Sequence, residues 1–252
     1  MRGLYRILPG NESIMKSIKN FIGLTWMLCG VACQMLAADA KFESLFNGKD
    51  LNGWEGDPKF WSVEDGCIVG KTTPQNPTKG NTFLIWRQGQ LEDFELVVKY
   101  KLVGNNPEKW GNSGIQYRSK DHGNFVVGGY QADIEGGPTY TGILYEERGR
   151  GILANRGEKV TVDASGKVKV TGSVGNSKDI QSHIKSEDWN EYVILAQGNK
   201  IVHKINGHTT MELTDEQVEK RSFKGILAFQ VHAGKPMSVY FKDIQLKRLP
   251  KE

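Results

Sequence analysis

The chain has 252 residues, of which 38% are hydrophobic and 30 are glycine. This length is enough for one large domain with a buried core, and short β-branched and aromatic runs between glycines favour an all-β protein over a helical one. The formal net charge is +4 at pH 7, and the chain contains no long block of Lys and Arg. The composition therefore gives no indication of nucleic-acid binding.

The N-terminal residues have the organisation of an export signal. After Met15, Lys16 and Lys19 precede an apolar stretch at residues 21–36, and several alanines follow it. This order is typical of a secretory signal peptide, and the apolar stretch is shorter than the roughly 20 residues of a membrane-spanning helix. We therefore expect a leader at residues 1–38, with its true start at Met15.

Cleavage is expected after Ala38 or Ala40, which would give a secreted or periplasmic protein without a membrane span. A lipoprotein anchored at Cys33 is the minor alternative, because Gly30 stands where a lipobox usually has Leu. The leader also carries most of the excess positive charge, so residues 39–252 have a net charge of only +1.

Ten strand-like stretches follow one another and are separated by Gly, Asn, Asp and Pro. They lie at residues 60–71, 82–87, 94–103, 113–119, 125–135, 142–147, 159–172, 191–207, 225–234 and 237–249. Such runs between turn residues are typical of antiparallel sheets. A short helix is expected at residues 214–222, where Thr214 and Gln217 match a capping box. No repeat or Pro-rich linker interrupts the chain, so we predict a single all-β domain at residues 39–252, an antiparallel two-sheet jelly-roll sandwich.

Three of these strands place long polar side chains on one face, because residues two apart along a strand point the same way. The residues selected by this alternation are Gln116, Arg118, Gln131, Asp133, Glu135, Gln230 and His232. For any one of these strands, a polar face exposed to solvent is the simpler interpretation. Three such strands in one sandwich predict that their polar faces form a common concave groove. Amides, carboxylates and a guanidinium suit a ligand rich in hydroxyl groups, so we expect a carbohydrate.

A second group of residues is expected to bind substrate around this groove: Trp110, Tyr130, Glu146, Glu147 and Arg150. Trp110 is either a platform for a sugar ring or a loop aromatic. The charged members of the group lie either at the rim of the groove or in a salt-bridge cluster of a loop. His203 is expected at the surface, near a hairpin turn.

The chain resembles the 3-keto-disaccharide hydrolase family, which was formerly a domain of unknown function. Six stretches carry the resemblance, and the first and third are the most specific. They are FESLFNGKDLNGW (42–54), WSVEDGCIVG (61–70), GNSGIQYRS (111–119), GYQADIE (129–135), GILAFQVHAG (225–234) and VYFKDIQLKRL (239–249). The resemblance implies a concanavalin A-like jelly roll.

The resemblance also implies a secreted or periplasmic enzyme that cleaves glycosides whose sugar carries a 3-ketone, by hydrolysis or by elimination followed by hydration. Another enzyme must first oxidise the sugar at C3. The ketone acidifies the hydrogen on C2, and a base that removes this hydrogen expels the aglycone from C1.

His232 is the first candidate for the base, because an imidazole accepts a proton at neutral pH. Asp133 or Glu135 is the alternative base, and Arg118 is expected to bind the enolate oxygen. A divalent metal held by His232, Asp133 and Glu135 would instead polarise the ketone. No other cofactor is expected.

Two other functions remain open at the level of the sequence. A non-catalytic carbohydrate-binding module would use the same polar face, although it has little need for a histidine and two carboxylates. An ordinary glycosidase needs two carboxyl groups either about 5 Å or about 6.5–9.5 Å apart. Asp133 and Glu135, two residues apart on one strand, are roughly 6.5–7 Å apart at their Cα atoms, so spacing leaves this alternative open.

Overall fold

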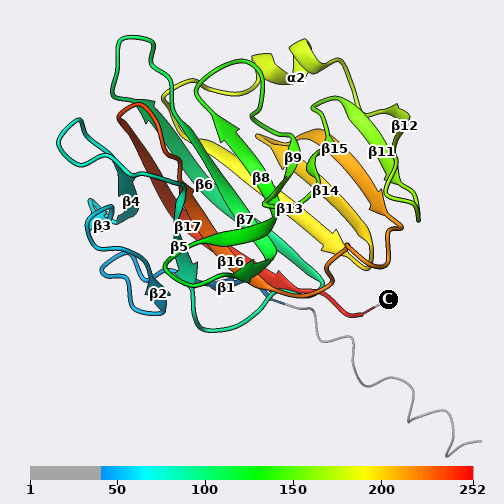
Figure 1. The fold of residues 1–252 in the computed structure, drawn as a ribbon, viewed down its shortest axis with the longest axis horizontal. Helices are drawn as coiled ribbons and strands as arrows, with labels where there is room; N and C mark the ends of the chain where they lie inside the picture. The colour runs from blue at the N-terminus through cyan, green and yellow to red at the C-terminus, as the bar shows by residue number, and fades with distance from the viewer. Residues whose placement is uncertain (1–40, 252) are drawn as a thin grey trace, which may run out of the picture. The chain divides into compact units, whose positions relative to one another are not determined.

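Residues 41–251 are the part of the chain that the computed structural model describes, and they form two β-sheets packed face to face (Figure 1). The expected leader and its cleavage sites lie outside the described residues. Within residues 41–251, no helix is long and apolar enough to cross a membrane. The two sheets agree with the predicted sandwich.

The larger sheet has ten strands in the order β12-β11-β15-β14-β13-β6-β17-β4-β3, with β1 paired to β17. All its neighbouring strands are antiparallel except β11 and β15, which run parallel. Its strands are β1 (Glu43–Ser44), β3 (Trp61–Glu64), β4 (Cys67–Lys71), β6 (Phe94–Gly104), β11 (Glu158–Val162), β12 (Val168–Ser173), β13 (Asn190–Gln197), β14 (Lys200–Ile205), β15 (His208–Asp215) and β17 (Met237–Arg248).

The smaller sheet has seven strands in the order β10-β9-β8-β7-β16-β5-β2, all antiparallel to their neighbours. Its strands are β2 (Trp54–Glu55), β5 (Thr82–Trp86), β7 (Asn112–Asp121), β8 (Val127–Glu135), β9 (Leu144–Glu147), β10 (Gly151–Ala154) and β16 (Ile226–Val231). Its order brings β7, β8 and β16 together, as the polar-face prediction requires.

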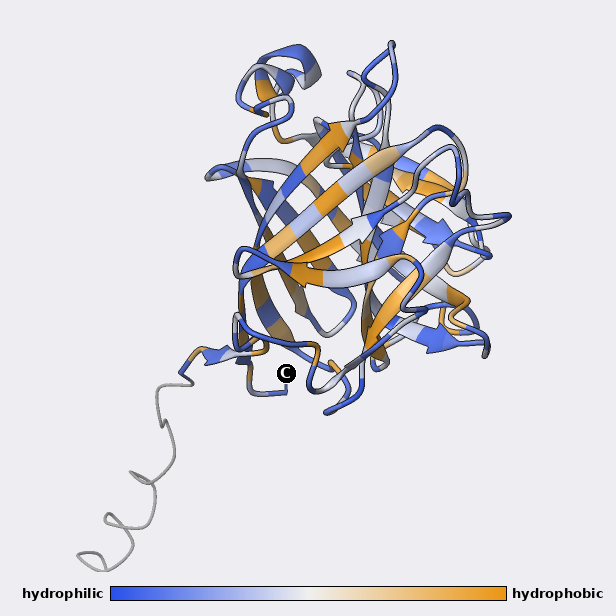
Figure 2. Ribbon diagram, turned by 90° about the vertical axis from the view of Figure 1, so that its left-hand side faces the viewer, coloured by the Kyte–Doolittle hydropathy of each residue, from blue (hydrophilic) through white to orange (hydrophobic). Residues whose placement is uncertain are grey.

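Alternation of apolar and polar residues builds the core between the sheets. In β6 and β13 every second residue is buried, and Figure 2 shows hydrophobic and hydrophilic residues alternating along the strands. The inward side chains of both sheets form one cluster, in which the Phe229 ring of the small sheet stacks on Phe241 of the large sheet at 4.0 Å. Burial of this apolar surface drives the two sheets together.

Two sequence-based expectations about local structure are wrong. Residues 214–222 do not form a helix, because β15 continues to Asp215. Among residues 41–251, the helix is α2 (Ser177–Ser182), capped by Asn176. His203 is fully buried, and its ring nitrogens contact the hydroxyls of Tyr117 and Tyr192. The alternation of β14 turns His203 into the core, where burial lowers its pKa to about 3 and keeps it neutral.

A bulge in β7 removes Arg118 from the polar face on which the sequence placed it. The pairing of β7 with β8 shifts register between Tyr117 and Lys120, and Arg118 has a φ of 46°, in the left-handed region. Because a bulge interrupts the alternation of side chains, Arg118 turns away from Gln116. Its guanidinium is buried and donates to the Glu92 and Gly198 carbonyls and to the Asp93 carboxylate. The expectation that Arg118 lies beside the other polar-face residues is therefore wrong.

Arg118→Ala is expected to lower the free energy of unfolding by about 3–5 kcal/mol, because it leaves the Asp93 carboxylate buried without its partner. Urea unfolding followed by tryptophan fluorescence measures this loss. The control is Lys99→Ala, which removes the exposed pair with Asp243 and should cost about 1 kcal/mol or less. Equal losses in the two variants would contradict the buried role of Arg118.

Candidate functional site

A cavity of about 270 Å³ lies on the face of the small sheet that points away from the core. This face is set by β8, in which Ala132 and Ile134 enter the core and Asp133 therefore points outwards. The cavity is lined by Asn81, Asn112, Gln131, Asp133, Tyr140, Ile143, Tyr145, Glu147, Ile152 and His232. Its volume is below the roughly 300–1,000 Å³ of sites for drug-sized ligands, so it suits one sugar ring with part of a substituent.

Gln131 connects three strands under this cavity. Its Oε1 accepts from Nε2 of Gln116 at 2.8 Å and from Nε2 of Gln230 at 3.0 Å, and its Nε2 donates to Oδ1 of Asp133 at 2.9 Å. Gln116 and Gln230 are fully buried and do not line the cavity. They belong to its support, whereas Gln131 and Asp133 reach its surface.

Asp133 is the most perturbed acid in the cavity. It is 6% exposed, and burial raises its pKa to about 8, with further contributions from the charges of Glu135 and Glu147; the hydrogen bond from Gln131 opposes this rise. A carboxyl group with such a pKa carries its proton in most molecules at neutral pH. Asp133 can therefore act as a proton donor in the cavity.

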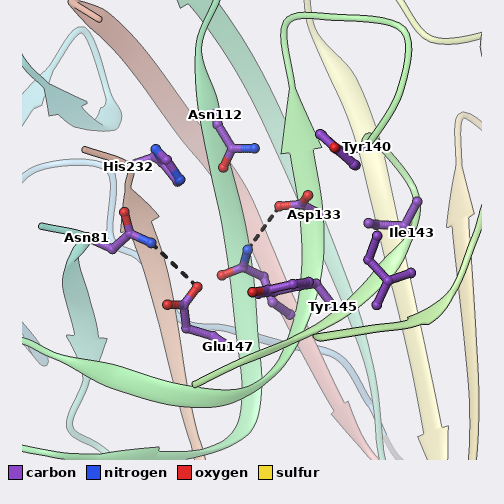
Figure 3. A pocket seen from close by; sticks show the side chains of 10 residues that line it. Asn81, Asn112, Asp133, Tyr140, Ile143, Tyr145, Glu147 and His232 are labelled. Atoms are coloured by element: carbon purple, nitrogen blue, oxygen red, sulfur yellow. Dashed lines mark hydrogen bonds between the residues drawn. The ribbon is translucent and has the colours of Figure 1, made fainter. Parts of the chain in front are cut away.

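Glu147 and His232 lie across the cavity from Asp133 (Figure 3). Burial raises the pKa of the half-buried Glu147, and the charge of His232 opposes this rise. Nδ1 of His232 lies 2.5 Å from the Ala233 carbonyl oxygen, which can only accept, so Nδ1 carries a proton. Nε2 of the neutral ring is then the nitrogen with a free lone pair. The Trp110 ring meets His232 edge to face at 5.8 Å, so Trp110 supports the imidazole without lining the cavity.

Glu135 does not take part in this site. Its Oε2 accepts the backbone N–H groups of Thr139 and Tyr140, at 3.1 and 2.9 Å, and it fixes the loop after β8. The expectation that Glu135 faces the same cavity as Asp133 is wrong, because β8 ends at Glu135 and the chain turns there.

Three further residues predicted to bind substrate lie elsewhere. Arg150 binds the carboxylates of Glu146 and Asp215, at 2.6 and 2.7 Å, and the Tyr130 hydroxyl donates to Asp215. Tyr130 is 1% exposed and stacks on Tyr117 in the core. The expectation that Tyr130, Glu146 and Arg150 lie at this cavity is therefore wrong, because alternation sends Glu146 and Tyr130 to the side opposite Glu147 and Gln131. For Glu146 and Arg150 the structure shows the alternative, a salt-bridge cluster.

The sequence reasoning missed Asn81, Asn112, Tyr140, Ile143, Tyr145 and Ile152, which also line the cavity. Tyr145 could have been predicted from the sequence, because it is two residues from Glu147 in the same strand and shares its face. Asn81 and Tyr140 lie in loops, and Asn112 begins β7, so no periodic pattern pointed to them.

The metal-binding set suggested by the sequence does not form. Among residues 41–251, no three His, Cys, Asp or Glu side chains gather as metal ligands would. Of the three residues considered, Asp133 and His232 share the cavity, whereas the carboxylate of Glu135 binds the loop N–H groups.

Residues 41–247 match the sequence profile of the 3-keto-alpha-glucoside-1,2-lyase-like domain. The chain belongs to this family. The match confirms the resemblance to 3-keto-disaccharide hydrolases found in the sequence. One relative, a 3-keto-disaccharide hydrolase of Bacteroides thetaiotaomicron, is 32% identical over an alignment of 87 residues that covers 31% of this chain and 27% of the relative. The aligned part is therefore about a quarter of the relative's length.

Solved structures share the fold of this 3-keto-alpha-glucoside-1,2-lyase-like domain. A protein of Parabacteroides distasonis named as a candidate glycosyl hydrolase has a TM-score of 0.52 and 20% identity, over 83% of this chain and 94% of the other. The carbohydrate-binding module CBM66 of Bacillus subtilis has a TM-score of 0.51 and 12% identity, over 77% and 95%. A galectin-like protein of Bacillus subtilis has a TM-score of 0.54 and 10% identity, over 84% and 96%.

Asp133→Asn is expected to stabilise the protein increasingly from about pH 4 to about pH 8. The pKa of Asp133 is near 3.8 in the unfolded chain and about 8 in the folded one, so only the unfolded state releases the proton in this interval. Folding of the wild type therefore loses stability as the pH rises, and the amide variant is free of this loss. Melting temperatures at pH 4, 6 and 8 measure the difference.

Asp163→Asn is the control, and its change in stability relative to the wild type should have the opposite sign. The hydrogen bond from Lys169 lowers the pKa of Asp163, so the folded state favours its ionised form. This variant should be less stable than the wild type at pH 8, and the difference should shrink as the pH falls. A melting temperature of Asp133→Asn that follows the wild type at every pH would contradict the protonated state of Asp133.

Proposed function

We propose that this protein is an exported enzyme that cleaves the glycosidic bond of 3-keto-glucosides by elimination and hydration. The observation that carries the proposal is that Asp133, a buried carboxyl group whose pKa is raised to about 8, lines the same cavity as the imidazole of His232. A proton donor and a proton acceptor in one site are the pair that acid–base catalysis needs. Family membership supplies the substrate class, and the leader supports export.

The reaction has two steps, elimination and hydration, and each step needs one base and one acid. The base removes the proton from C2, the electron pair forms the double bond between C2 and C1, and the bond from C1 to the glycosidic oxygen breaks. The acid protonates the departing oxygen. Water then adds to C1 of the unsaturated ketone, C2 regains a proton, and the net result is hydrolysis.

His232 is suited to be the base, since Nε2 of the neutral ring has a free lone pair. The carboxylate of Glu147 is suited to stabilise the imidazolium that forms, since the charge of His232 opposes the rise in the pKa of Glu147. Asp133 is suited to donate the proton to the leaving oxygen, and a deprotonated Asp133 then activates the incoming water.

Asn112 is suited to bind the enolate oxygen, the role that the sequence analysis expected of Arg118. It lines the cavity and is 8% exposed, and its side chain makes no hydrogen bond with the residues that the structure describes. Its amide N–H groups are therefore available to the ketone oxygen, on which negative charge develops when C2 loses its proton. Asn81 is already engaged, because its Oδ1 accepts from Ala233 N–H and its Nδ2 contacts Glu147.

A glycosidase with two carboxyl groups is the second candidate, because Asp133 and Glu147 share the cavity. Glu147 in β9 pairs with Gly129, four residues from Asp133 along the neighbouring β8, so the Cα atoms of Glu147 and Asp133 are roughly 14–15 Å apart. A retaining enzyme needs carboxyl groups about 5 Å apart, which this register disfavours. An inverting arrangement remains compatible with it.

The deciding experiment compares a 3-keto-glucoside with its unoxidised parent, with aglycone release followed for both. Only the ketone is expected to react, and a substrate deuterated at C2 should react more slowly when proton removal limits the rate. Equal cleavage of ketone and parent would reject elimination in favour of the two-carboxylate glycosidase. Saturable binding of sugar without cleavage of either would favour a binding module.

His232→Ala is expected to lower kcat on the 3-keto-glucoside by about 100-fold or more, the usual contribution of one general base. The melting temperature should stay close to that of the wild type, because His232 directly follows the last residue of β16 and is only partly buried. His208→Ala, a substitution at an exposed position outside the cavity, is the matched control and should retain full activity. A His232→Ala enzyme with wild-type turnover would remove His232 from the mechanism.

A further inference from the structure

The cavity has two chemically different walls. His232, Asn81 and Glu147 stand on one side of Asp133, and Tyr140 and Ile143 stand on the other (Figure 3). The first wall supplies every group that the proposed chemistry requires except Asp133 and Asn112. The second wall supplies no titratable group that the reaction uses.

The second wall is apolar and open to the ligand. Ile143 is almost fully buried behind it, whereas Tyr140 and Ile152 are 42% and 41% exposed. Large apolar side chains that stay exposed in the lining of one cavity are a common sign of a ligand surface. A sugar hydroxyl would find few hydrogen-bonding partners there.

The loop that carries Tyr140 is held in place from two sides. Glu135 accepts its N–H groups, and the guanidinium of Arg156 donates to three of its carbonyl oxygens, those of Pro138, Thr139 and Thr141, at 2.6, 3.3 and 2.6 Å. Arg156 is only 7% exposed. A buried arginine and a carboxylate thus fix the position of a loop whose tyrosine ring remains exposed, which is the arrangement of a preformed binding platform.

Asp133 lies between the two walls, so its role in the reaction determines which part of the substrate contacts each wall. In the proposed function Asp133 donates its proton to the glycosidic oxygen, and His232 removes the proton from C2 of the sugar. The sugar ring therefore occupies the side of His232, and the group beyond the glycosidic oxygen extends towards Tyr140 and Ile143 (Figure 3). Ile152 lies in β10, on the side of β8 away from β16, and lines the same cavity.

From this geometry we infer that Tyr140, Ile143 and Ile152 form an aglycone subsite that selects 3-keto-glucosides with an aromatic leaving group. A flat ring stacks on Tyr140 and packs its edge against Ile152, with the buried Ile143 behind them, which removes apolar surface from water on both partners. The inference rests on the proposed function for the direction in which the substrate lies, and it adds the class of aglycone.

The test compares benzyl and methyl 3-keto-glucosides of the same anomer. Benzyl alcohol and methanol are nearly equal in acidity, so the two aglycones differ in the aromatic ring and hardly in leaving ability. The wild type is expected to show a kcat/KM about tenfold higher for the benzyl substrate, as one stacked and buried ring would give. Equal values for both substrates would overturn the subsite.

Variants locate the preference within the cavity. Tyr140→Ala and Ile152→Ser should each reduce the benzyl-to-methyl ratio of kcat/KM by about threefold to tenfold. Tyr140→Phe keeps the ring and should keep the ratio, and Val170→Ser, at a position 61% exposed in β12 of the other sheet, should leave it unchanged. A ratio that survives Tyr140→Ala and Ile152→Ser would place the aglycone elsewhere.

Binding of the unoxidised benzyl and methyl glucosides separates this inference from the proposed function. If neither ketone is cleaved, the proposed reaction fails, and saturation-transfer NMR still reports on the subsite. The benzyl ring should then receive the strongest transfer, and Tyr140→Ala should abolish the advantage of benzyl over methyl glucoside. Equal binding of the two glucosides would overturn the subsite independently of catalysis.

Discussion

The chemistry of the cavity depends on the orientation of one buried amide, that of Gln131. Because its Oε1 already accepts from Gln116 and Gln230, its Nε2 is turned towards Asp133. An amide nitrogen can only donate, so Oδ1 of Asp133 must accept and the proton of this carboxyl group resides on Oδ2. Three strands of the small sheet thereby determine which oxygen of Asp133 can give a proton to a ligand.

Backbone and burial together hold this arrangement, at a cost to stability. A Cβ atom on Gly114 would lie 2.5 Å from Cγ and Cδ of Gln131, so the absence of a side chain there makes room for the amide. Oε1 of Gln230 is buried and has no hydrogen-bond partner among the described residues, and Asp133 is kept from ionising. Unfavourable groups of this kind concentrate at functional sites, where they serve chemistry rather than folding.

Alternation along strands predicted the sandwich and part of the site, and it failed where strands are irregular. It placed Gln131 and Asp133 on one outward face, since β8 is regular between them. It misplaced Arg118, which lies in a bulge, and Glu135, which ends its strand. Loop residues such as Tyr140 have no period to follow, and their position depends on long-range contacts that only the fold defines.

The lining of the cavity also has a consequence for the charge of the substrate. It contains two carboxyl groups and an imidazole, and no lysine or arginine. Arg118 and Arg156 are buried and Arg150 is partly buried, and all three are engaged by carbonyl oxygens or carboxylates away from the cavity. A uronic acid or a sugar phosphate would bring a second negative charge into a partly dehydrated cavity beside the Glu147 carboxylate, with no lysine or arginine in the lining to meet it, so the electrostatics of the cavity would favour uncharged sugars.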